Sequence, residues 1–355
     1  MISFALTEGQ RLAQAAAAQF ARDVARPAAR AAEEAAAFPE SVLAAGWALG
    51  LAQAVASGEA LDQPTVVNAL ALDEIAYGDA ALAVALAAPL GFVRAVASQG
   101  TEDQRKRHLP PFASDTPAFG AVAATDAGWF GGVGRKTRAD RARNGWRIDG
   151  AKALTPLASR CERLLVTAET GKGTRGFVVE RSAPGLRIEP AKGTLGLRAL
   201  QMADIVLEGV TVPEADCLPG SARRILDASR IAFSAMLSGL ARAVYDYALP
   251  YAKERVVHGE AIGRKQAVAF KLADMHIAAN AMRWMGLRAA AEFDSDAGAA
   301  RTARLAQRYA AEQGVRIADE GVQIFGGYGF VRDYPLEMWY RNARSLSTLD
   351  GLVGA

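Results

Sequence analysis

Hydrophobic and polar positions along the chain fall into three successive patterns. The first covers residues 7–112, where Ala, Leu, Glu, Gln and Arg dominate and apolar residues return at helical spacing. Such residues favour helices, and Val66, Val67 and Leu70 would lie on one face of a helix within residues 64–79. An apolar face on each helix suits packing against other helices. The pattern therefore predicts an N-terminal bundle of four or five helices.

The second pattern begins near Pro117 and consists of short alternating stretches separated by turn residues. The pair Asn144-Gly145 lies between two such stretches and predicts a hairpin closed by a type I′ turn, which needs positive φ angles. Further strands are expected at residues 164–168, 176–180, 186–189 and 202–212. We therefore predict a small antiparallel β domain over residues 118–218.

The third pattern consists of longer helices. They are predicted at residues 223–255, 266–293 and 299–324, with a short last helix beginning near Pro335. Pro250 falls inside the first of them, at a place where a proline ring would kink or end the helix. The chain is thus predicted to be mainly α with a central β domain. Its expected parts are an N-terminal helical domain, a middle β domain and a C-terminal four-helix bundle, at residues 1–117, 118–218 and 219–355.

Composition narrows the class of protein. The chain has 355 residues, of which 51% are hydrophobic and 22% charged, with a formal net charge of +3. These values exclude an intrinsically disordered chain, and the length suits two or three domains. Cys161 and Cys217 supply neither a disulfide framework nor the spacing of a zinc site, so no metal is expected. The N-terminus shows no secretion signal, and we expect a reduced, cytoplasmic compartment.

Two further classes of partner are not expected. The longest uncharged apolar run, residues 80–93, contains Pro89 and is shorter than the roughly 20 residues of a membrane span. We therefore predict a buried helix there and no membrane span. The positive charge comes from scattered arginines without interleaved aromatic residues, which gives little reason to expect a nucleic acid partner. A ligand that carries phosphates remains compatible with this charge.

Several short motifs follow one another in a definite order. The last third of the chain carries QIFGGYGF, YPLE and RNAR at residues 323–330, 334–337 and 341–344. Upstream lie YAKER at residues 251–255, then Gln266, and FKLADM at residues 270–275. Weaker motifs are GTEDQ at residues 100–104 and GLR at residues 196–198. In this order the motifs resemble the acyl-CoA dehydrogenase family over nearly the whole chain.

The resemblance implies an FAD-dependent protein with the three-part fold predicted above. It assigns the cofactor contacts to Arg255, His258, Gln266, Gln323, Gly326, Gly327, Thr125 and Thr155. Arg255 and Gln266 would bind the FAD of the facing subunit, where a planar guanidinium suits a pyrophosphate. Glycines allow the backbone to approach phosphate closely. Taken alone, the glycine pair would be an ordinary loop, Arg255 a helix cap and His258 a surface residue.

The family's reaction removes an α proton from an acyl-CoA thioester and transfers a β hydride to flavin N5. The position of the family's catalytic glutamate is occupied by Asp350, followed by a matching Gly351. Aspartate is one methylene shorter, and a misplacement of about 1 Å costs roughly a hundredfold in rate. Ser229 stands at the family's alternative base position and cannot accept the proton without an activator. Asp227, Arg230 and Gly351 are expected to contact the substrate.

The middle domain departs from the family's loop sequences at residues 125–132, which are one residue shorter and lack a Ser-Asp pair, and at residues 154–156. Three interpretations stay open. The first is an acyl-CoA dehydrogenase with Asp350 as base, active in lipid catabolism and reoxidised by an electron-transferring flavoprotein. The second is a poorly active or non-catalytic partner subunit of a hetero-oligomer. The third is a flavoenzyme of the same fold that uses a carrier-protein thioester or oxygen. Retention of Arg255, Gln266 and Gln323 favours the first, as a homo- or hetero-oligomeric dimer or tetramer.

Overall fold

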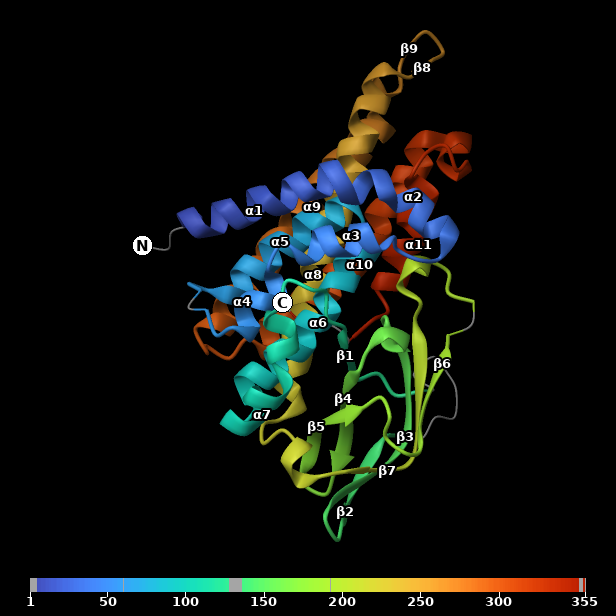
Figure 1. Cartoon of the computed structure of the whole chain (residues 1–355). Coiled ribbons are helices and arrows are strands. Elements are labelled where there is room, and N and C mark those ends of the chain that lie inside the picture. The colour runs from blue at the N-terminus through green and yellow to red at the C-terminus, as the bar shows by residue number, and fades with distance from the viewer. Residues whose placement is uncertain (1–4, 60, 128–135, 192, 351–353, 355) are drawn as a thin grey trace.

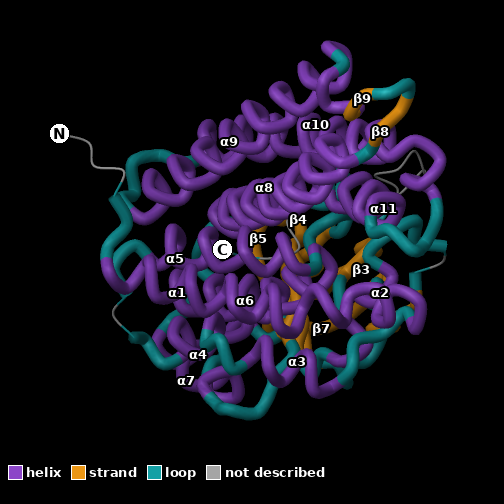
Figure 2. The backbone as a smooth tube through the Cα atoms, turned by 90° about the horizontal axis from the view of Figure 1, so that it is seen from above, coloured by secondary structure: helices purple, strands orange, loops and turns teal. Residues whose placement is uncertain are grey.

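The computed structural model describes residues 5–59, 61–127, 136–191, 193–350 and 354. Helices from the two ends of the chain pack together, and the sheet from its middle lies beneath them (Figure 1). Seen from above, the helices cover the strands (Figure 2). The helical part and the sheet each have a buried apolar core of their own. The predicted fold class, mainly α with a central β domain, is confirmed.

The N-terminal part contains more and shorter helices than its sequence pattern predicts. Its α-helices are α1 (Glu8–Phe20), α2 (Arg26–Ala35), α3 (Glu40–Trp47), α4 (Leu51–Ala56), α5 (Pro64–Gly78), α6 (Ala80–Gln99) and α7 (Glu102–His108). A π-helical turn, Ala21–Ala25, joins α1 to α2 without a break. Thr7 and Thr101 begin α1 and α7 with capping boxes, each satisfying a backbone N–H of the first turn.

Helix α6 passes through the centre of the molecule and continues through Pro89. Among the described residues, it is the helix long and apolar enough to cross a membrane, and 89% of its most apolar window is buried inside the protein. Such burial is typical of a core helix, which is the element predicted for residues 80–93. Asp79 caps its start by accepting a hydrogen bond from the backbone N–H of Ala81.

The sheet is mixed, with antiparallel pairs in the majority. Its strands are β1 (Gly120–Ala123), β2 (Arg138–Ala142), β3 (Gly145–Thr155), β4 (Arg163–Thr170), β5 (Gly173–Glu180), β6 (Leu186–Pro190) and β7 (Ala203–Val212). Their order is β1-β4-β2-β3-β7-β6, with β5 also paired to β4. Strands β1 and β2 run parallel to β4, whereas the sequence pattern predicts antiparallel pairing alone.

The hairpin between β2 and β3 forms, but its predicted turn is wrong. Ala142 pairs with Gly145, so the turn residues are Arg143 and Asn144, and neither has a positive φ. Gly145 belongs to the strand with a φ of 138°. A Cβ at this position would lie 2.3 Å from the carbonyl oxygen of Val212 on β7. The glycine is required by this close approach of a neighbouring strand and not by a type I′ turn.

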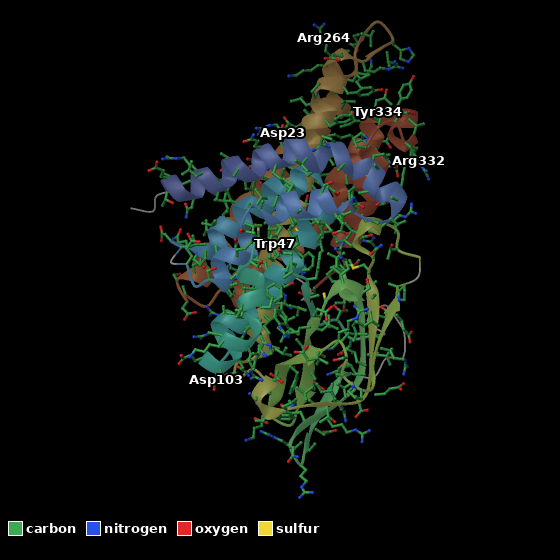
Figure 3. All side chains as sticks on the ribbon, viewed as in Figure 1. Asp23, Trp47, Asp103, Arg264, Arg332 and Tyr334 are labelled. Atoms are coloured by element: carbon green, nitrogen blue, oxygen red, sulfur yellow. The ribbon has the colours of Figure 1, made fainter. Side chains whose placement is uncertain are left out.

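The C-terminal part consists of long helices and one small hairpin. Its elements are α8 (Ala222–Glu254), β8 (Val256–Val257), β9 (Glu260–Ala261), α9 (Gln266–Asp294), α10 (Ala300–Phe325) and α11 (Leu336–Leu346). Pro250 does not end α8, which runs on to Glu254. The end of α8 and the β8–β9 hairpin project from the body (Figure 1). Arg264 marks the tip of this projection, with Arg332 and Tyr334 lower down (Figure 3).

Helices α5 and α8 pack closely enough to join the two helical parts into one core. Leu70 and Leu72 of α5 and Phe233 and Met236 of α8 are fully buried in the same apolar cluster. At Gly239 of α8, a Cβ would lie 1.9 Å from the carbonyl oxygen of Asp73. This packing fixes the long helix that carries several of the predicted site residues.

Candidate active site

Asp350 lies against the first third of α8. Its Oδ2 is 2.9 Å from Nη2 of Arg230, and Nη1 of Arg230 is 3.3 Å from Oδ1 of Asp227. Asp227 and Arg230 are three residues apart on the helix and therefore share a face. The side chain of Asp350 is 36% exposed and that of Arg230 is 18% exposed. The structure thus brings together three of the residues predicted for catalysis and substrate binding.

The second carboxylate oxygen of Asp350, Oδ1, is buried and accepts no hydrogen bond from the part of the chain that the structure describes. A carboxylate with one oxygen fixed by a guanidinium and the other unpaired has the arrangement required of an oriented general base. Gly351, predicted to contact the substrate, lies outside the described residues.

The loop that carries Asp350 is held on two sides. The hydroxyl of Thr125 donates a 2.9 Å hydrogen bond to the carbonyl oxygen of Asp350. The amide of Gln307, on α10, donates a 3.1 Å hydrogen bond to the carbonyl oxygen of Leu349. The sequence motifs single out neither contact, because the pairs are distant along the chain.

Ser229 has the properties expected of a residue that does not act as a base. Its side chain is completely buried, and its hydroxyl has no hydrogen-bond partner among the described residues. A serine accepts a proton at neutral pH only with an activating partner. Within the described part of the chain, Ser229 has no hydrogen-bonded partner that could serve as its activator.

Thr125 and Thr155 lie on adjacent extended segments of the middle domain. The N–H of Ala153 donates a 2.9 Å hydrogen bond to the carbonyl oxygen of Thr125, and Thr155 ends β3 two residues later. The hydroxyl of Thr155 is buried and has no partner in the described chain. Buried hydroxyls are normally hydrogen-bonded, so this orphaned donor is compatible with a ring that presents an acceptor. The hydroxyl of Thr125 is already engaged by Asp350.

A second cluster of predicted residues gathers at the other end of α8. Arg255, His258 and Gln266 are all exposed, on or beside the β8–β9 hairpin. The Arg255 guanidinium lies 5.6 Å from the ring centroid of Tyr328 and forms no ion pair with any described residue. An exposed arginine without a carboxylate partner is suited to an anionic ligand. Stacking by His258 stays a prediction.

Gln323 and the glycine pair border this second cluster. Gln323 is exposed in the last turn of α10, three residues before the pair Gly326 and Gly327. Gly326 has a φ of 58° and a ψ of −131°, a conformation that glycine adopts readily. A Cβ at either glycine would meet no atom within 4 Å, so the backbone is open to a ligand. An open glycine turn, an amide and an unpaired cation form a donor set that fits a pyrophosphate.

Within one chain, the two clusters of predicted site residues lie far apart. Arg230 lies near the start of α8 and Arg255 follows its last residue, 25 positions later. At about 1.5 Å per residue, the helix separates them by about 38 Å. The predicted catalytic residues and the predicted pyrophosphate contacts therefore occupy opposite ends of one helix.

Comparisons with known proteins identify the family. The chain matches the N-terminal, middle and C-terminal domains of acyl-CoA dehydrogenases over residues 7–116, 126–210 and 220–352. It is 32% identical to a probable acyl-CoA dehydrogenase of Bacillus subtilis, over 99% of this chain and 96% of that protein. The chain belongs to the acyl-CoA dehydrogenase family. The family is FAD-dependent and carries out dehydrogenation of acyl-CoA thioesters.

Two further relatives show how far the likeness extends. The structure of butyryl-CoA dehydrogenase from Megasphaera elsdenii is similar with a TM-score of 0.87 and 26% identity, over 97% of this chain and 95% of that one. The CarC subunit of the caffeyl-CoA reductase–Etf complex of Acetobacterium woodii is 31% identical over 71% of this chain and 69% of that protein. The predicted family and cofactor are thereby confirmed, while the individual site residues stay predictions.

Proposed function

We propose that this protein is an FAD-dependent acyl-CoA dehydrogenase in which Asp350 removes the α proton of the thioester. The observation that carries the proposal is the carboxylate of Asp350, fixed by Arg230 through one oxygen and unpaired at the other. By the resemblance in sequence, Asp350 would stand at the position of the family's catalytic glutamate. Asp227 orients Arg230 from the same face of α8.

In this proposal, Asp350 accepts the proton and other residues of the chain orient it. Arg230 holds Oδ2 of Asp350, so Oδ1 is left to take the proton. Thr125 and Gln307 hold the backbone of the loop and limit its movement. A bound acyl chain would cover the exposed part of the Asp350 side chain and shield the proton transfer from bulk water.

The proposed cofactor contacts lie in two places, near Asp350 and near Arg255. When bound, FAD supplies the hydride acceptor, N5 of its ring. The Thr155 hydroxyl and the backbone of Thr125 would hold the ring. Arg255, Gln266, Gln323 and the turn of Gly326 and Gly327 would hold the pyrophosphate and adenine, with His258 beside them. Because these contacts lie at opposite ends of α8, we propose that the second cluster serves the FAD of a facing subunit in a homo- or hetero-oligomer.

The partners proposed for this reaction are an acyl-CoA substrate and an electron-transferring flavoprotein. The relative from Acetobacterium woodii is named as a subunit of a complex with such a flavoprotein, which supports the second partner. We also propose a cytoplasmic location and a role in fatty acid or lipid catabolism. Both cysteines, Cys161 and Cys217, are free and buried, which suits a reducing compartment.

The function can be tested on the purified chain. We expect a flavin absorption spectrum that bleaches during anaerobic titration with an acyl-CoA. Asp350→Asn removes the base and should slow flavin reduction by about 10²- to 10⁴-fold, the usual contribution of general base catalysis. Asp140→Asn, on the exposed face of β2, is the matched control and should reduce at the wild-type rate. An unchanged rate in Asp350→Asn would remove this residue from the mechanism.

Two other outcomes correspond to the other interpretations of the sequence. An isolated chain that holds no flavin, but gains it with a second subunit, would indicate a non-catalytic partner subunit. Flavin that is reduced by an acyl-carrier protein and not by any acyl-CoA would indicate a carrier-protein thioester as substrate. The departures of the middle-domain loop around Thr125 from the family pattern are the reason to include this second substrate.

A further inference from the structure

A lysine is buried in the middle domain, directly behind the loop of Thr125. Lys152 lies on β3 with 2% of its surface exposed. Its ammonium is 2.7 Å from Oδ1 of Asp126, 3.1 Å from the carbonyl oxygen of Ala124 and 3.3 Å from the hydroxyl of Thr167. Three acceptors match the three protons of an ammonium group. Burial lowers the pKa of Lys152, and the neighbouring Asp126 opposes this shift.

Two of these acceptors lie on either side of Thr125. Ala124 and Asp126 are its neighbours in the chain, so Lys152 fixes the backbone before it and the side chain after it. Asp126 is held further by Thr137, whose N–H and hydroxyl donate at 3.2 and 2.8 Å. The N–H of Ala153 also donates to the carbonyl oxygen of Thr125. The position of Thr125 is therefore determined from several directions.

Thr125 transmits this position to the proposed base. Its hydroxyl donates a 2.9 Å hydrogen bond to the carbonyl oxygen of Asp350, 225 residues away in the sequence. A continuous series of contacts thus runs from the Lys152 ammonium through residues 124–126 to Asp350. We propose that Lys152 is a positioning residue that places the catalytic carboxylate through Thr125. This inference rests on the proposed function of Asp350 as the base.

A buried charge is suited to holding the segment around Thr125 in place. A buried ammonium is tolerated when it is paired and fully hydrogen-bonded, and such a group holds its acceptors in defined places. A misplacement of about 1 Å at a reacting group lowers a rate roughly a hundredfold. Asp350 is one methylene shorter than the family's glutamate, so the position of its backbone decides how far its carboxylate reaches.

A double-mutant cycle tests the series of contacts in the FAD-loaded protein. Lys152→Met removes the ammonium, and Thr125→Val removes the hydrogen bond to Asp350. Each should lower the rate constant of flavin reduction by an acyl-CoA about a hundredfold, while KM changes less than about threefold. If Lys152 acts through Thr125, the double variant should be no slower than Thr125→Val alone. Thr125→Ser keeps the hydroxyl and should restore most of the rate.

The controls separate positioning from a purely structural role. Lys136→Met removes an exposed lysine that pairs with Glu169, and it should change nothing. The visible absorption envelope of the bound FAD should shift in Lys152→Met and not in Lys136→Met, because residues 124–126 adjoin the proposed ring site. A structural role alone would lower the melting temperature and leave the rate constant and the envelope unchanged, and this result would overturn the proposal.

Further outcomes are also decisive. A double variant slower by the product of the two single effects, about 10⁴-fold, would show that Lys152 acts by another route. If Lys152→Met does not fold, Asp126→Asn weakens the shortest contact, and an unchanged rate there would overturn the proposal. An active Asp350→Asn would refute the proposed base itself. An inactive Asp350→Asn with a fully active Lys152→Met would refute the role of Lys152 alone.

Discussion

Asp79 provides a prediction whose size follows from the structure. It caps the start of α6, where its Oδ1 accepts a 2.9 Å hydrogen bond from the N–H of Ala81, and it is only 6% exposed. Burial, with a smaller contribution from the nearby Glu33, raises the pKa of this carboxyl group to about 7 from its ordinary 3.8. The Ala81 hydrogen bond and Arg26 oppose the shift. The ionised form of Asp79 is thus disfavoured in the folded protein.

The sign of the pH dependence follows from proton binding. Between pH 3.8 and about 7, Asp79 is protonated in the folded chain and ionised in the unfolded chain, so stability falls as the pH rises. About three pKa units at about 1.4 kcal/mol each give a loss of about 4 kcal/mol, complete above pH 7. Asparagine caps a helix as well as aspartate does and carries no charge. The Asp79→Asn variant should therefore not lose stability in this way as the pH rises.

Urea unfolding of the wild type and the variant at two pH values measures the effect. The variant should gain over the wild type as the pH rises from 5 to 8, by about 2 to 3 kcal/mol in the free energy of unfolding. Asp79→Ala should show the same pH-dependent gain, with about 1 kcal/mol less stability at both pH values because the cap is lost. A difference between Asp79→Asn and wild type that is equal at the two pH values would refute the reasoning.

Two further predictions concern the contact between α5 and α8. Gly239→Ala places a Cβ 1.9 Å from the carbonyl oxygen of Asp73 and should lower the free energy of unfolding by about 3 kcal/mol, measured by thermal melting. Gly9→Ala, whose Cβ meets no atom within 4 Å, is the control, and equal melting temperatures would contradict the prediction. Arg242→Met removes the 2.7 Å ion pair with the buried Asp73 and should destabilise the protein by about 3–5 kcal/mol in urea. Loss of less than about 1 kcal/mol, the value of an exposed pair, would show that Arg283 alone compensates the carboxylate.

The parts of the fold that could be predicted from the sequence are those set by local periodicity. The long C-terminal helices follow from local composition, and the buried helix at residues 80–93 follows from an uncharged apolar run; they are present as α8 to α10 and α6. The turn at Asn144-Gly145 is wrong because the need for Gly145 comes from β7, more than sixty residues later. Parallel pairing of β1 with β4 likewise depends on a connection that no local pattern specifies.

The candidate site also has a part that could be predicted from the sequence and a part that could not. Asp350, Arg230 and Asp227 were predicted from motifs, and the structure brings them into contact. Lys152 was missed, although alternation along β3 places it on the inward side with Trp146 and Ile148. A lysine on the inward side of a strand indicates a buried polar interaction. Its partners in residues 124–126 could be identified only from the pairing of this segment with β3.

The two threonines of the middle domain illustrate how the structure changes a prediction made from a motif. The resemblance treats Thr125 and Thr155 as equivalent flavin contacts, yet their hydroxyls differ. That of Thr125 is committed to the loop of Asp350, whereas that of Thr155 is buried without a partner in the described chain. Removal of the Thr155 hydroxyl should therefore weaken cofactor binding, and removal of the Thr125 hydroxyl should slow proton transfer.

This difference also bears on the short side chain of the proposed base. A glutamate has an additional torsion with which to reach the α carbon, whereas an aspartate depends more on where its backbone lies. Here the backbone around Asp350 is held by Thr125 from the middle domain and by Gln307 from α10, and its carboxylate is held by Arg230 from α8. Three elements that are distant in sequence thus fix one loop. Preorganisation of this kind is the physical means by which a shorter base can retain a productive geometry.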